Sequence, residues 1–102
     1  MKKVSGYCDP NFSEVGEIFT RAIESGHETG AALAIEHEGK MVVDLYGGHK
    51  DSARTESWEE DTMVNVFSVT KGVTATCIAR LIDQGKLDVN KKVSDYWPEY
   101  GC

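Results

Sequence analysis

One serine and one lysine stand at a spacing that can support nucleophilic catalysis. The segment Ser68-Val69-Thr70-Lys71 places Lys71 three residues after Ser68, and residues three apart in a helix lie on the same face. A serine hydroxyl is a poor nucleophile until a neighbouring base takes its proton, and an uncharged lysine amine can be that base. The spacing therefore favours acyl transfer through Ser68, with Lys71 as its general base.

Such a pair makes a large demand on its surroundings. The ordinary pKa of a lysine is about 10.4, so a base that works near neutral pH needs that pKa lowered by about three units, or roughly 4 kcal/mol. A helix N-terminus disfavours a charged amine by at most about 2 kcal/mol. Burial and a second cationic or hydrogen-bonding group must supply the rest. The sequence offers no obvious candidate for that second group.

A purely structural role for the same two residues stays open. Serine is favoured at the residue before a helix, so Ser68 can be an N-cap and Lys71 a solvated residue of the first turn. At ordinary residue frequencies, a chain of this length contains a Ser-x-x-Lys by chance about four times in ten. The motif alone is therefore weak, and its surroundings must decide.

Two helices are predicted from apolar residues that recur every three or four positions. The first spans residues 10–25, with Asp9 as its N-cap, Pro10 at its first position and Gly26 at its end. The second spans residues 68–84 and carries the Ser-x-x-Lys at its start. Its apolar stripe includes Cys77, which is expected in the core, and Gly85 is expected to end it.

A β-hairpin is predicted between the helices. Residues 31–37 and 41–46 have strand character, Glu38-Gly39 suits a two-residue turn, and Gly47-Gly48 is expected to end the second strand. Residues 49–62 are polar and predicted as a loop, with Trp58 expected to be a structural plug below the second helix. The aromatic residues of the tail are expected to cover a domain junction: Tyr96, Trp97 and Tyr100.

Composition and charge exclude several classes of protein. Of 102 residues, 40% are hydrophobic and 27% charged, which is typical of a folded domain. No stretch approaches the roughly 20 apolar residues that span a bilayer. The net charge of −6 and the lack of a basic patch argue against nucleic-acid binding. Three cysteines without Cys-x-x-Cys spacing, and three histidines without ligand spacing, make a metal site unexpected.

The surroundings of the motif resemble the nucleophile region of the β-lactamase-related serine hydrolases. Residues 58–72 carry this resemblance, and further segments extend it through almost the whole chain. These are Gly30-Ala31-Ala32, Glu38-Gly39-Lys40, Asp44-Leu45-Tyr46-Gly47-Gly48, residues 81–88 and Tyr96-Trp97-Pro98-Glu99-Tyr100. The family includes class C β-lactamases, D-Ala-D-Ala carboxypeptidases and family VIII esterases, and the similarity is closest to the esterase branch.

The resemblance implies both a fold and a site. The fold would be α/β (α+β), of the β-lactamase/transpeptidase type, with an antiparallel sheet flanked by helices and an all-helical domain beside it. Ser68 would be the acylated nucleophile, Lys71 its general base, and the backbone N–H of Ser68 half of an oxyanion hole. The substrate would be a small-molecule ester or amide, with no cofactor and no metal.

The chain departs from the family in length. Family members are several-fold longer and carry a Tyr-x-Asn and, on a distant strand, a Lys/His-x-Gly; here no Tyr-x-Asn occurs and no later strand carries the third motif. We therefore expect residues 1–102 to be the N-terminal segment of one β-lactamase-like domain, truncated at Cys102. Its partner would be the missing C-terminal part of that domain.

Two classes of function stay open. In a full-length parent, a cytoplasmic esterase acting on short acyl esters is favoured, because Lys2-Lys3 is not followed by the apolar segment of a signal peptide. The alternative for that parent is a β-lactamase or a D-Ala-D-Ala carboxypeptidase. For the 102-residue chain alone, a non-catalytic fragment or interaction module is favoured over independent catalysis.

Overall fold

The structure is a computed structural model that describes residues 4–101. The chain divides after Met63 into two units, which we call the sheet unit and the helix unit. The described residues do not include Met1, Lys2, Lys3 and Cys102. The expectations about a signal peptide and about truncation concern these residues, so the structure does not test them.

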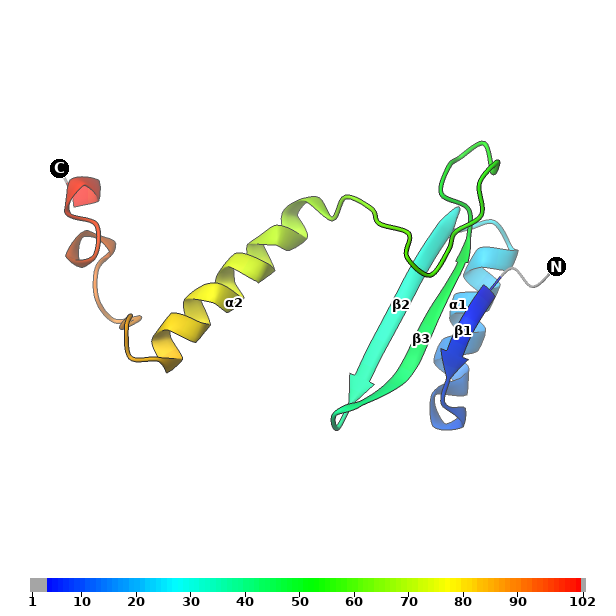
Figure 1. The fold of residues 1–102 in the computed structure, drawn as a ribbon, viewed down its shortest axis with the longest axis horizontal. Helices are drawn as coiled ribbons and strands as arrows, with labels where there is room; N and C mark the ends of the chain where they lie inside the picture. The colour runs from blue at the N-terminus through cyan, green and yellow to red at the C-terminus, as the bar shows by residue number, and fades with distance from the viewer. Residues whose placement is uncertain (1–3, 102) are drawn as a thin grey trace. The chain divides into compact units, whose positions relative to one another are not determined.

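An antiparallel sheet of three strands forms the sheet unit (Figure 1). Its strands are β1 (Val4–Cys8), β2 (Gly30–His37) and β3 (Lys40–Gly48), and β3 lies between the other two. The predicted hairpin is confirmed as β2 and β3. Its turn has positive φ at both Glu38 (51°) and Gly39 (75°), the conformation of a tight type I′ turn. The second strand extends beyond the predicted Tyr46 through Gly47 and ends at Gly48, within the glycine pair expected to end it.

Strand β1 is absent from the sequence-based prediction, which had only two strands. Its residues pair with β3 from Val4 opposite Gly47 to Cys8 opposite Val43. Gly6 interrupts any apolar alternation and has a φ of 108°, and a Cβ there would collide with the carbonyl oxygen of Asp44. The strand is therefore held by a partner far away in the chain, a cause that a local pattern does not record.

The first predicted helix is confirmed with one change at its start. A 3-10 turn (Pro10–Phe12) precedes α1 (Ser13–Glu24). The Asp9 carboxylate accepts a hydrogen bond from the Asn11 N–H at 2.9 Å, as expected of an N-cap. Gly26, just beyond the helix, has a φ of 77°.

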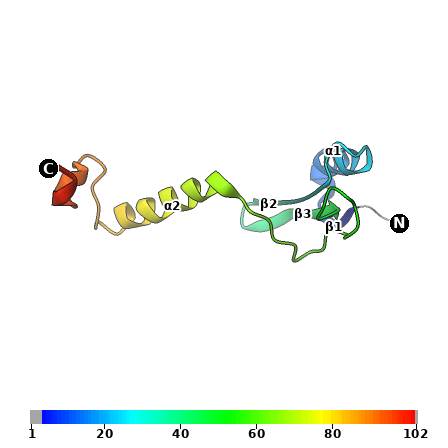
Figure 2. The same ribbon diagram turned by 90° about the horizontal axis from the view of Figure 1, so that it is seen from above.

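The core of the sheet unit lies between α1 and the sheet, since α1 covers one face of it (Figure 2). Val43 is fully buried, and Val42, Leu45 and the α1 residue Ile23 are also buried. Partly buried apolar side chains pack around this centre: Val4, Cys8, Phe12, Phe19, Leu33 and Ile35. Strand β1 and the 3-10 turn thus contribute to the core as well as the predicted elements.

The helix unit contains α2 (Thr70–Asp83), preceded by a 3-10 turn (Phe67–Val69) and followed by two more, Val93–Asp95 and Pro98–Gly101. Gly85 ends α2 as predicted, with a φ of 67° and its N–H donating to the Ile82 carbonyl at 2.9 Å. No helix of the described residues is long and apolar enough to cross a membrane.

The apolar stripe of α2 is exposed in the structure. It comprises Val69, Val73, Ile78, Leu81 and Ile82. Cys77 is exposed as well, so the expectation that it belongs to the core is wrong for the residues described. Besides α2, the described part of the helix unit contains only short 3-10 turns, and these leave the stripe exposed.

Trp58 packs within the sheet unit. Its backbone N–H donates to the Gly48 carbonyl at 2.9 Å, and its ring lies so close to Gly30 that a Cβ there would clash. The indole Nε1 is buried without a hydrogen-bond partner among the described residues. The packing on the strands supports a structural role, whereas the expected position below α2 stays a prediction.

The tail aromatics make contacts inside the helix unit. The Tyr96 hydroxyl accepts a hydrogen bond from the Asp88 N–H at 2.7 Å. The rings of Trp97 and Tyr100 lie 5.7 Å apart. All three side chains are also substantially exposed, and their expected place at a domain junction stays a prediction.

Candidate active site

The structure brings together the two side chains that the sequence singled out. The Lys71 Nζ donates a hydrogen bond to the Ser68 Oγ at 2.8 Å. This distance lies within the range over which a base can take a proton directly. The pair can therefore exchange a proton without an intervening water.

The local backbone explains why the two groups meet. Ser68 lies in the 3-10 turn and Lys71 in the first turn of α2, and the Thr70 N–H donates to the carbonyls of both Phe67 and Ser68. This bonding joins the 3-10 turn to α2 in one continuous helical path. Ser68 and Lys71 consequently occupy one face of it.

The alternative in which Ser68 is an N-cap does not match this geometry. The residue before the 3-10 turn is Val66 and the residue before α2 is Val69, and neither makes a side-chain cap hydrogen bond. Ser68 lies inside the helical path rather than ahead of it. Its hydroxyl accepts a hydrogen bond from Lys71 Nζ, so the structure favours a paired role for Ser68 over a capping role.

The surroundings of the pair are open to solvent. Ser68 and Lys71 are both exposed, as are the neighbouring apolar side chains of Phe67 and Val69. Charge interactions gain strength when water is excluded, and the described part of the helix unit does not exclude it. The two side chains thus lie at the distance that proton transfer needs. Their surroundings, however, do not exclude the water that weakens charge interactions.

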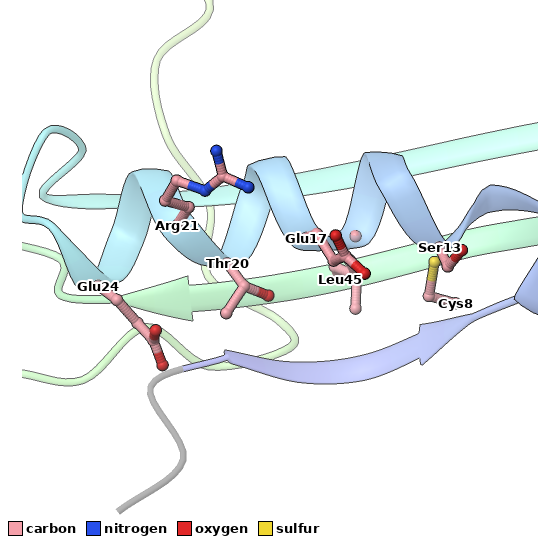
Figure 3. Close-up of a pocket in the computed structure, with 8 residues that line it drawn as sticks. Cys8, Ser13, Glu17, Thr20, Arg21, Glu24 and Leu45 are labelled. Carbon is pink, nitrogen blue, oxygen red and sulfur yellow. The ribbon is translucent and has the colours of Figure 1, made fainter.

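Two of the grooves among the described residues lie away from the pair. One of about 540 Å³ runs between α1 and the sheet, with Cys8 and Leu45 among its lining residues and Glu17 and Arg21 beside them (Figure 3). Another, of about 360 Å³, is lined by residues of α2 and of the segment that follows it, including Ile78 and Trp97. Neither is lined by Ser68 or Lys71, so neither supplies an acyl pocket to the pair.

His27, His37 and His49 all lie in the described part of the sheet unit. No group of three or more histidine, cysteine, aspartate or glutamate side chains there could hold a metal ion. His37 lies beside Phe12, with the ring centroids 6.0 Å apart. His37-Glu38-Gly39 matches Lys/His-x-Gly by residue type, but it forms the end of β2 and the hairpin turn.

Comparison with known proteins identifies several relatives of the chain. The sequence model of a family described as Beta-lactamase matches residues 15–101. The esterase/beta-lactamase LipL of Mycobacterium tuberculosis is 40% identical over 101 residues, which are 99% of this chain and 24% of the relative. Protein flp of Staphylococcus aureus is 26% identical over 85% of this chain and 18% of its own length.

Solved structures agree with these sequence matches. A family VIII carboxylesterase superposes with a TM-score of 0.92 at 41% identity, over 97% of this chain and 27% of its own. A penicillin-binding protein homologue from Caulobacter crescentus superposes with a TM-score of 0.87 at 42% identity, over 95% and 26%. The chain thus spans about a quarter of the length of these relatives.

Proposed function

Since the chain belongs to the Beta-lactamase family, and its fold is that of β-lactamase/transpeptidase-type proteins, we propose that it carries the nucleophile of a serine hydrolase. Ser68 is the acylated residue and Lys71 its general base. The observation that supports this assignment is the 2.8 Å contact between Lys71 Nζ and Ser68 Oγ.

The proposed reaction proceeds in two steps. Uncharged Lys71 takes the hydroxyl proton while Ser68 Oγ forms a bond to the carbonyl carbon of the substrate. The bond from that carbon to the leaving alcohol breaks, and the alcohol departs with the proton. Water then adds to the acyl carbon, releases the acid and restores the serine hydroxyl.

The names of two relatives support the proposed substrate class, an ester. One is named an esterase/beta-lactamase and another a family VIII carboxylesterase, which supports an esterase acting on short acyl esters. A β-lactamase or D-Ala-D-Ala carboxypeptidase activity is the alternative in a longer parent. Location in the cytoplasm stays a prediction.

A second candidate function has its own supporting observation. The apolar stripe of α2 is exposed, and the chain spans about a quarter of its relatives. Both facts favour a segment that is completed by the rest of a larger domain. In this alternative the 102-residue chain is a complementing piece without activity of its own.

One experiment tests the proposed function and separates the two candidates. The purified chain is exposed to a p-nitrophenyl ester of a short acid, and its intact mass is then measured. Acylation predicts one added acyl group, absent in Ser68→Ala and strongly reduced in Lys71→Met. Ser94→Ala, which alters the serine of another 3-10 turn, is the matched control and should keep the adduct.

Each outcome of this experiment has a definite meaning. An adduct that persists in Ser68→Ala would contradict the assignment of the nucleophile. An adduct that survives undiminished in Lys71→Met would remove the lysine from the mechanism. Absence of any adduct on the unaltered chain would favour the complementing piece over independent catalysis.

A further inference from the structure

The residue directly before Ser68 has an unusual backbone conformation. Among the described residues, three other than glycine have a positive φ: Glu38, Arg54 and Phe67. Glu38 lies in the hairpin turn, and Arg54 in a loop where its N–H donates to the Asp51 carbonyl. Phe67, at a φ of 44°, is the aromatic member of the group and adjoins the proposed nucleophile.

Packing of the ring does not account for this conformation. The left-handed region is costly for an L-residue with a bulky side chain, and such strain persists only where the surrounding structure enforces it. Yet the Phe67 side chain is 81% exposed, so no buried contact of the ring holds it. The backbone must therefore be enforced by the bonds around it.

Those bonds lie on both sides of the residue. The Val69 N–H donates to the Val66 carbonyl at 3.0 Å, which closes a turn across Phe67. The Phe67 carbonyl in turn accepts from the Thr70 N–H. Phe67 thus lies where the irregular segment before it enters the helical path, and the next residue, Ser68, is hydrogen-bonded to Lys71.

We propose that Phe67 is a positioning residue for the nucleophile, and that its left-handed backbone rather than its aromatic ring does this work. The inference rests on the proposed function, because it gives the Ser68–Lys71 contact a purpose. The inference goes further because it names the residue that orients Ser68 towards Lys71. A residue that adopts positive φ easily should replace Phe67, whereas a β-branched residue should not.

Three variants separate the backbone from the ring. Phe67→Gly removes the ring and favours positive φ. Phe67→Asn also removes it and tolerates the same region. Phe67→Val keeps an apolar side chain, but valine is β-branched and very rarely adopts the left-handed conformation. The contact between Ser68 and Lys71 should be retained in the first two variants and lost in the third.

The first measurement is nuclear magnetic resonance of the full 102-residue chain. A positive φ brings the amide and α protons of one residue close together, so Phe67 should show a strong cross-peak between them. A second cross-peak should join the Ser68 β protons to the Lys71 ε protons. It should persist in Phe67→Gly and Phe67→Asn and weaken in Phe67→Val, while α2 stays helical by circular dichroism.

Specific results would overturn the inference. A weak amide–α cross-peak at Phe67 in the unaltered chain would remove its premise. Loss of the Ser68–Lys71 cross-peak in Phe67→Gly or Phe67→Asn would show that the ring, not the backbone, positions the serine. If Phe67→Val also unfolds α2, Phe67→Gly and Phe67→Asn still decide whether the ring or the backbone positions Ser68.

The acylation assay supplies a second readout. Phe67→Val should acylate about tenfold more slowly than the unaltered chain, and Phe67→Gly at a similar rate to it. If the unaltered chain takes up no acyl group, independent catalysis fails, but the resonance measurements still test the positioning. The failure of one proposal is therefore distinct from the failure of the other.

Discussion

At the scale of single residues, two pairs of side chains use the same device. Lys71 meets Ser68 three residues away, and Thr55 meets Asp51 four residues away, each within one turn of the chain. In the loop after β3, the Thr55 hydroxyl and its backbone N–H both donate to the Asp51 carboxylate. Short local spacing therefore creates both the candidate site and the Asp51–Thr55 contact, which we call the loop clasp.

The loop clasp leads to a prediction about acidity. The hydrogen bond from the Thr55 hydroxyl, followed by that from its N–H, holds the pKa of Asp51 below its ordinary value. Thr55→Val removes the hydroxyl at nearly constant shape, so the pKa of Asp51 should rise towards its ordinary value. Titration of the carboxyl carbon by nuclear magnetic resonance measures it, and Thr62→Val is the control.

The sign of the linked stability follows from this direction. Because the pKa of Asp51 is lowered in the folded chain, its stabilising contribution is fully present above the pKa of the unfolded carboxyl. It is lost as the pH falls through the folded value. An unchanged pKa in Thr55→Val would show that the hydroxyl does not set it.

At the scale of elements, the buried apolar side chains of the sheet unit come from α1 and β3. Leu45 is 7% exposed and lies on the central strand, whereas Met41 on the same strand is 50% exposed. A buried leucine replaced by alanine loses both transfer free energy and packing, while an exposed side chain loses little. The strand thus contains its own matched control.

Leu45→Ala should lower the free energy of unfolding of the sheet unit by about 2–5 kcal/mol. Met41→Ala should change it by less than about 1 kcal/mol. Urea denaturation followed by Trp58 fluorescence measures both, in a Trp97→Phe background that leaves one tryptophan, in the sheet unit. Equal effects of the two substitutions would contradict the described core.

The elements also show how far the sequence could predict the structure. Both helices and the hairpin follow from local periodicity and from Gly26, Gly39 and Gly85 at their ends. Strand β1 could not be found this way, because its pairing with β3 is non-local. The nearness of Ser68 and Lys71 was predictable from spacing, but the left-handed Phe67 was not, since phenylalanine ordinarily avoids that region.

At the scale of the whole molecule, the sheet has two outer strands of different character. β1 is short and interrupted by Gly6, whereas β2 has eight residues and no proline or lysine. Lysine on an edge strand is a common defence against pairing with other chains. The outer edge of β2 lacks this defence, so we expect the chain to self-associate there as its concentration rises.

Ala34→Lys should reduce this self-association. Ala34 is exposed on β2, and a charge there opposes the approach of a second strand. Sedimentation velocity over a range of concentrations measures the effect. Ala53→Lys, an equal change of charge at an exposed loop residue, is the control, and equal behaviour of the two variants would place the contact elsewhere.

The strand order has a consequence for the time course of folding. The hairpin of β2 and β3 joins residues that are close in the chain, whereas β1 pairs Val4 with Gly47. Closing a long loop costs more entropy than closing a short one, and non-local pairing is slow. During synthesis, β1 must therefore wait, unpaired with β3, until β3 has emerged beside β2.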